Sequence, residues 1–156
     1  MPTRIFLEET PLRLQPEGDA AVTLPLDLAS LLAAGLARFP PSEAALEGAI
    51  ATVEDALMPH VAALRRYPLE VLQGDGSLLQ DIARAAGRGA PVQQGLRLSI
   101  EEVERLFNRL ADVAAGMPAR TQEIPESPRF VAALLVVREI LHHVGYQWLE
   151  ITARND

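Results

Sequence analysis

The chain has 156 residues, of which 49% are apolar, and a formal net charge of −7. It contains no cysteine and no lysine, so all 14 basic residues are arginines. This composition predicts one globular domain over residues 1–156, and it excludes disulfides, cysteine nucleophiles, lysine Schiff bases and phosphate-loop lysines.

The charge distribution and the apolar segments predict where the protein works. Residues 1–60 carry nine acids against three arginines, and such an acidic surface repels nucleic-acid backbones. The longest uncharged apolar stretch, Phe130–Val137, is far shorter than the roughly 20 residues of a membrane-spanning helix. Together with the absence of cysteine, these features predict a cytoplasmic protein that binds neither nucleic acid nor membrane.

The first part of the chain, residues 1–24, predicts a β hairpin or meander. Its short strands are expected at Arg4–Leu7, Leu12–Gln15 and Ala21–Leu24, between clusters of proline, glycine and acidic residues that favour turns.

Residues 27–145 predict a helical region. After Asp27, leucines recur at helical spacing until Pro40-Pro41. A second helix is expected from Ser42 to Met58, where Pro59 would kink or end it, and residues 60–66 could continue it for a further turn or two. Further helices are expected from Ser77 to Gly87, after Ser99, and from Ser127 to Gly145. Residues 88–98 predict a loop with a candidate strand at 96–98.

Residues 146–152 alternate between apolar and polar and predict a final strand. A lone hairpin is marginally stable, so we expect this strand to join those at the N-terminus. The expected fold is α+β, mostly helical, with four to five helices and a small antiparallel sheet formed by the N-terminal strands and the C-terminal strand.

Four of the five serines stand where a helix is expected to begin. Ser42, Ser77, Ser99 and Ser127 can each accept a hydrogen bond from an early helical amide, which makes them poor nucleophiles. The sequence therefore predicts no catalytic residue.

One cluster could bind a metal ion. Glu139 and His143 lie one helical turn apart with His142 beside them, and Glu54 or His60 could complete a site if the two helices are neighbours. The simpler interpretation is that the two histidines finish a helix, whose last carbonyl groups favour such side chains.

Two sets of charged residues suggest binding to partners. Glu43, Glu47 and Glu54 share one helix face and suit either a basic protein partner or a solvated surface. Arginines also pair one helical turn apart, as Arg84/Arg88 and Arg105/Arg109, and could bind phosphate or carboxylate groups. Acids three or four residues away favour solvated ion pairs instead. The glycines of Gly74-Asp75-Gly76 and of Arg88-Gly89 match no phosphate loop, because neither pair follows a clear strand into a helix with the required spacing.

These observations lead to two hypotheses about function. The first is a non-catalytic cytoplasmic protein-interaction module, such as an adaptor, an assembly factor or a small subunit, without a cofactor. Because the last helix is apolar almost all round, it would lie in the core or be shared with a partner, most simply in a homodimer. The alternative is a helical metal- or small-ligand-binding protein or enzyme that uses Glu139, His142 and His143.

Overall fold

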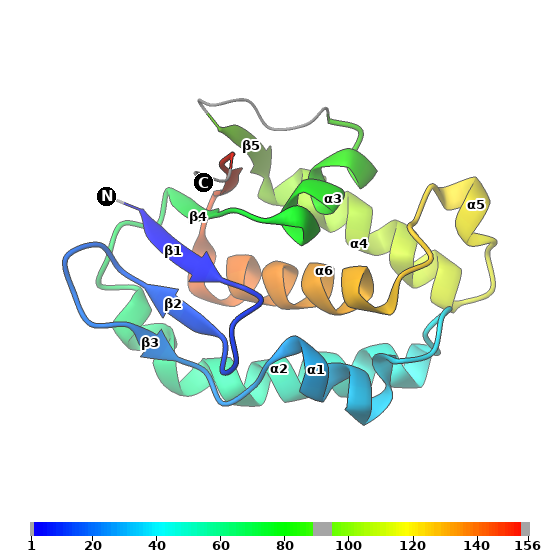
Figure 1. Cartoon of the computed structure of the whole chain (residues 1–156), viewed down its shortest axis with the longest axis horizontal. Helices are drawn as coiled ribbons and strands as arrows, with labels where there is room; N and C mark the ends of the chain where they lie inside the picture. Colours follow the sequence, from blue (N-terminus) through cyan, green and yellow to red (C-terminus); the bar gives the residue numbers. More distant parts are fainter. Residues whose placement is uncertain (1, 89–94, 154–156) are drawn as a thin grey trace.

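The computed structural model describes residues 2–88 and 95–153, and six strands within them form one mixed sheet. The order across the sheet is β3-β2-β1-β4-β6-β5, which Figure 1 shows from β3 at the lower edge to β5 at the upper edge. The strands are β1 Thr3–Phe6, β2 Arg13–Gln15, β3 Val22–Thr23, β4 Val71–Gly74, β5 Leu96–Ser99 and β6 Trp148–Ile151.

The sheet corrects the prediction of a small antiparallel sheet. The first three strands form the expected meander, with β1–β2 and β2–β3 antiparallel. However, β4 runs parallel to β1 on one side and to β6 on the other, whereas β5 is antiparallel to β6. The C-terminal strand therefore pairs with β4 and β5, and the expected antiparallel union of the two chain ends is wrong.

The helices join these strands. They are α1 Leu28–Leu31, α2 Glu43–Leu64, α3 Ser77–Ala85, α4 Ile100–Ala114, α5 Ala119–Gln122 and α6 Pro128–Ile140, with π-helical turns η1 Leu32–Leu36 and η2 Leu141–Gly145. Parallel strands need long crossover connections, and α2 provides one between β3 and β4. The six α-helices of the described residues exceed the four to five that were expected.

Helix boundaries follow local chemistry at most of the serines. The hydroxyls of Ser42, Ser99 and Ser127 accept hydrogen bonds from amides three residues later, at 3.0, 3.1 and 3.2 Å. Ser77 does not act as a cap, because Gly76 holds the cap position of α3 and no side chain among the described residues caps it. The predicted capping role of Ser77 is therefore wrong.

Packing overrides one local signal. Pro59 lies inside α2, which continues to Leu64, so the structure has the continuation beyond the proline and not an end at Met58. Val61 and Leu64 beyond the proline are buried, and burying such side chains contributes roughly 1.5–3 kcal/mol each. That is comparable to the ~3 kcal/mol that an interior proline costs.

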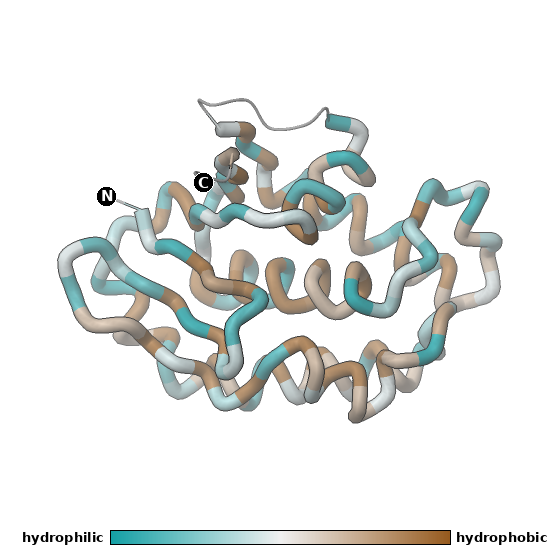
Figure 2. Tube along the Cα trace, viewed as in Figure 1, coloured by the Kyte–Doolittle hydropathy of each residue, from teal (hydrophilic) through white to brown (hydrophobic). Residues whose placement is uncertain are grey.

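The core is centred on α6, with α2 on one side and α3 and α4 on the other (Figure 1). Every residue from Phe130 to Val137 is at most 1% exposed, and Figure 2 shows apolar segments gathered along the facing helices. The apolar surplus of this helix is thus used within the chain. It no longer supports the prediction of a partner or homodimer, which stays a prediction.

The described residues 2–88 and 95–153 include no helix with the length and hydropathy required to cross a membrane. The predicted loop at residues 88–98 lies partly outside the described residues, because residues 89–94 are not described. The candidate strand at residues 96–98 is present as β5.

Candidate functional site

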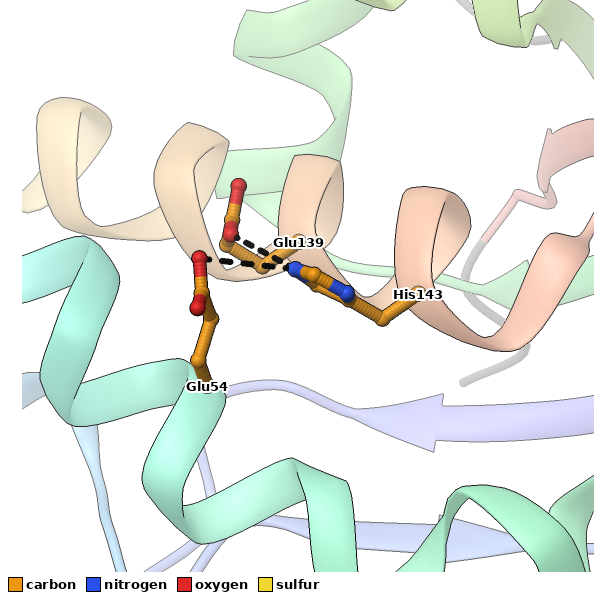
Figure 3. A group of neighbouring side chains, drawn as sticks. All are labelled: Glu54, Glu139 and His143. Carbon is orange, nitrogen blue, oxygen red and sulfur yellow. Dashed lines mark hydrogen bonds and ion pairs between the residues drawn. The ribbon is translucent and has the colours of Figure 1, made fainter.

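Three of the predicted metal-binding residues converge between two helices. Glu54 comes from α2, Glu139 from α6 and His143 from η2, and their side chains point toward one another (Figure 3). The Nε2 atom of His143 lies 3.2 Å from Oε1 of Glu139 and 3.5 Å from Oε1 of Glu54. One ligand atom from each residue can be chosen so that all three lie within 4.8 Å of one another.

Burial makes Glu139 the unusual member of this cluster. Its side chain is 1% exposed, against 40% for Glu54 and 23% for His143. A carboxylate taken out of water needs compensating partners. Arg138 supplies one, since its Nη1 lies 2.7 Å from Oε2 of Glu139, which leaves Oε1 facing His143.

Arg138 is itself held by α4. It donates hydrogen bonds to both carboxylate oxygens of Glu104, each at 2.9 Å, and its guanidinium lies 4.3 Å from the ring centre of Phe107. The hydrogen bonds to Glu104 raise the pKa of Arg138, and the same contact lowers the pKa of Glu104. Both groups therefore stay charged near neutral pH.

The turn that carries His143 is tied to the end of α2. Arg65 donates from Nη2 to the carbonyl of His143 at 2.8 Å and from Nε to the carbonyl of Val144 at 3.1 Å. Carbonyls at a helix end otherwise lack intrahelical partners. Arg65 thus fixes the π-helical turn against the helix that supplies Glu54.

The remaining predicted residues lie apart from this convergence. His142 is exposed, and its ring packs edge-on against that of His143 with centroids 5.2 Å apart. His60 is half-buried and does not belong to the metal-ligating group found among the described residues. Glu43 and Glu47 are exposed on α2, so their proposed contact with a basic partner stays a prediction.

A second candidate region lies at the carboxyl ends of the parallel strands, which is called the carboxyl edge of the sheet below. It was not predicted from the sequence. Strand β4 ends at Gly74, and α3 begins at Ser77 after only Asp75 and Gly76. Gly76 has φ +109°, which L-residues rarely adopt. Gly74 and Gly76 therefore do connect a strand to a helix, contrary to the prediction, although their spacing remains different from that of a phosphate loop.

Gly74 lets α3 approach the sheet closely. A Cβ atom at Gly74 would lie 2.7 Å from Cδ1 of Leu79 and 2.9 Å from Cγ2 of Ile5. A strand followed by a glycine turn and a close-packed helix was the signal that could have revealed this region. It was hidden because residues 71–74 form a strand too short to stand out as a periodic pattern.

Charged groups surround this turn. Oε2 of Glu8 lies 3.3 Å from the position of a Cβ atom at Gly76, and Oε1 of Glu8 accepts a hydrogen bond of 2.9 Å from Arg129. On the neighbouring side, Arg4 donates to Asp75 at 2.9 Å. A carboxylate here is favoured by the positive end of the helix dipole, which is also where α/β proteins bind phosphate.

The fold is similar to that of known enzymes. Two solved structures of Ppx/GppA proteins from Aquifex aeolicus align with 97% of this chain, with TM-scores of 0.71 and 0.67 and identities of 13% and 12%. An exopolyphosphatase from Cytophaga hutchinsonii aligns with 91% of it, with a TM-score of 0.64 and 14% identity. This chain has the fold of these proteins.

The alignments cover 52%, 51% and 49% of the solved chains, so this chain spans about half their length. No protein-family model and no curated protein sequence matches it.

The likeness overturns the leading hypothesis about function. Further matches include a Ppx/GppA phosphatase from Aquifex aeolicus and an exopolyphosphatase-like protein. Because the proteins that share the fold are named as phosphatases and exopolyphosphatases, the interpretation as a non-catalytic adaptor, assembly factor or small subunit is contradicted. The ligand-binding or enzymatic alternative agrees better with the fold.

Proposed function

We propose that the chain binds phosphate-bearing ligands at the carboxyl edge of its sheet, as a domain of an enzyme that hydrolyses polyphosphate or phosphate esters. The observation that carries this proposal is the β4–Gly74-Asp75-Gly76–α3 connection in a chain with the fold of phosphatases. Ligands of open α/β sheets bind outside the carboxyl ends of parallel strands. Helix α3 presents its positive end at that edge.

The charges at the edge indicate how a phosphate group would enter. The carboxylate of Glu8 stands beside the turn and is held by Arg129, and both side chains are about half exposed. Exposed ion pairs contribute at most about 1 kcal/mol, so a phosphate can replace the carboxylate at the helix terminus at small cost. Arg129 would then pair with the phosphate, for which a guanidinium is well suited.

The displaced carboxylate has a role in the hydrolytic step. A water molecule attacks the terminal phosphorus, the bond from that phosphorus to the bridging oxygen breaks, and the leaving oxygen keeps the electron pair. Glu8 accepts the proton of the attacking water as a general base. Asp75, paired with Arg4, can approach a magnesium ion carried by the substrate, because magnesium commonly binds one or two carboxylates together with substrate phosphates.

Titration with tripolyphosphate in the presence of magnesium tests the binding step. We expect Arg129→Gln to weaken binding by about tenfold, the effect of losing one charge-assisted contact. Glu8→Gln should tighten binding because it removes a competing negative charge. Arg66→Gln serves as the matched control, because Arg66 is exposed and precedes the amino end of β4, whereas the proposed site follows its carboxyl end.

Release of inorganic phosphate from polyphosphate tests the enzymatic step. Wild type should release phosphate, and Glu8→Gln should lose this activity while it still binds. Binding without any release would contradict the enzymatic part of the proposal. An equal response of Arg129→Gln and Arg66→Gln would contradict the location of the site.

A cytoplasmic location completes the proposal. It rests on the absence of cysteine, which fits a reducing compartment.

A further inference from the structure

We infer that Glu54, Glu139 and His143 form a zinc-binding site that is separate from the carboxyl edge of the sheet. The separation follows from the topology. The first turn of α6 carries Arg129, which contacts Glu8 beside the carboxyl edge of the sheet. The other end of α6 leads into the turn η2, which precedes the amino end of β6. The cluster therefore lies toward the opposite end of the helix from the phosphate region.

The distances fit a tetrahedral ion. With zinc–nitrogen and zinc–oxygen distances of about 2.0–2.2 Å, two ligand atoms of a tetrahedral site are separated by about 3.3–3.5 Å. The separations from Nε2 of His143 are 3.2 Å to Glu139 and 3.5 Å to Glu54. Two of the three ligand–ligand distances are thus already close to those of a zinc site.

The third edge joins the two carboxylates. Two like charges repel each other until a cation lies between them. The distance between the carboxylates of Glu54 and Glu139 is therefore expected to be the longest of the three before an ion binds. Glu54 is 40% exposed and can rotate toward Glu139. Only a movement of the Glu54 side chain is needed to bring the two carboxylates to the spacing of zinc ligands.

The groups around the ligands orient them in the manner of a metal centre. Metal-bound carboxylates are themselves hydrogen-bonded, and Arg138 holds Oε2 of Glu139 while Oε1 stays directed at His143. Glu104 fixes Arg138 from α4, and Arg65 fixes the backbone of His143 from the end of α2. Three helices and one turn therefore determine the position of the two ligands from α6 and η2.

The ligand set favours zinc. One imidazole nitrogen and two carboxylate oxygens suit zinc, manganese and ferrous iron, and zinc binds more tightly than the other two in the usual order of divalent affinities. Three protein ligands leave a fourth position for water. An ion in this place would connect α2 with the end of α6.

The competing explanation is that His143 only forms hydrogen bonds with the two carboxylates. An imidazole can donate one proton from Nε2, so it satisfies one of the two carboxylates at a time. A zinc ion would bind both carboxylates and the nitrogen together. Metal titration separates the two explanations.

The experiment uses the protein after treatment with a chelator. Zinc is titrated by calorimetry, and cobalt is added to a second sample because tetrahedral cobalt has a strong visible absorption. We expect one zinc ion per chain, a tetrahedral cobalt spectrum and a melting temperature that rises with zinc, since an ion that binds only the folded protein stabilises it.

Variants of neighbouring residues provide matched controls. His143→Gln and Glu54→Gln should weaken zinc binding by roughly 100-fold or more, at or above the 10- to 100-fold loss typical of outer-shell partners. His142→Gln and Glu47→Gln, each exposed and on the same element as a proposed ligand, should bind zinc within threefold of wild type. Glu54 is partly exposed, so Glu54→Gln keeps the test valid if His143→Gln fails to fold.

Two outcomes would overturn the inference. One is the absence of stoichiometric zinc binding to wild type. The other is zinc binding that survives in His143→Gln but is lost in His142→Gln, which would indicate a surface histidine. Neither outcome concerns polyphosphate, so the phosphate proposal stands or falls separately.

Discussion

Two arginine–glutamate pairs lie at opposite ends of α6, and their surroundings give them different roles. At the start of the helix, Arg129 pairs with Glu8, and the two side chains are 51% and 45% exposed. Near its end, Arg138 pairs with Glu139, and the exposed fractions are 20% and 1%. The first pair is open to solvent and can exchange for a ligand, whereas the second supports the cluster around His143.

The difference follows from what each pair contacts. Glu8 belongs to the β1–β2 turn and Arg129 to the first turn of α6, so water reaches both. Glu139 faces the interior, where an unpaired charge is costly, and Arg138 is fixed further by Glu104 and by the ring of Phe107. The same two residue types thus form a weak contact at one end and a strong one at the other.

The largest loss of stability is expected from a substitution in the middle of α6, the helix that carries Arg129 and Arg138. Leu135 lies in the middle of α6 and is fully buried. Leu135→Ala should lower the free energy of unfolding by about 2–5 kcal/mol, because it removes buried apolar surface and leaves a cavity. Denaturant melts would measure this loss. Met117→Ala, a substitution at a half-exposed position, serves as the control. Similar stabilities of the two variants would contradict the central place of α6 in the core.

The comparison of the two pairs gives the second prediction. Arg138→Gln should cost about 2–4 kcal/mol, because it leaves the buried carboxylate of Glu139 without its cation. Arg129→Gln, which affects the exposed pair, should cost less than about 1 kcal/mol. The measurement is the midpoint of urea unfolding for both variants at pH 7. Equal losses would show that the burial of Glu139 does not distinguish the two pairs.

A fall in pH should weaken the contact between Arg138 and Glu104, and with it the stability of the protein. Hydrogen bonds from Arg138 lower the pKa of Glu104 from its ordinary value of 4.5. A carboxyl group whose pKa is depressed by folding contributes stability above its unfolded pKa and loses it as the pH falls through the folded value. Unfolding measured from pH 6 to pH 3 should therefore show a shallower loss of stability in Glu104→Gln than in wild type below about pH 4.5. Parallel curves would indicate that Glu104 is not stabilised by Arg138.

The two regions also differ in how far the sequence could predict them. Glu139 and His143 are one turn apart, so their shared face follows from helix geometry alone. The addition of Glu54 required α2 and α6 to be neighbours, and the structure places them side by side. The edge at Gly74 could not be found in this way, because its meaning depends on β4, a strand of four residues whose pairing partners are distant in sequence.

The prediction of the sheet failed for a related reason. The strands at Thr3–Phe6 and Arg13–Gln15 are adjacent in sequence, and their antiparallel pairing is local. The partner of Trp148–Ile151 is decided by the crossover helices, since β6 pairs in parallel with β4 across the connection that contains α3 and α6. Periodicity identifies such a strand but carries no information about its neighbour.

The smallest expected effect compares the helix termini themselves. Helix α4 is capped by Ser99, whose side chain accepts from the amide of Glu102, whereas α3 begins at Gly76 without a side-chain cap among the described residues. Ser99→Ala should therefore cost about 1 kcal/mol, and Ser77→Ala should change the free energy of unfolding by no more than about 0.5 kcal/mol. Thermal melts of the two variants would measure both values. If Ser77→Ala cost as much as Ser99→Ala, the amides at the start of α3 would already be satisfied by its hydroxyl. They would then be unavailable to a phosphate group.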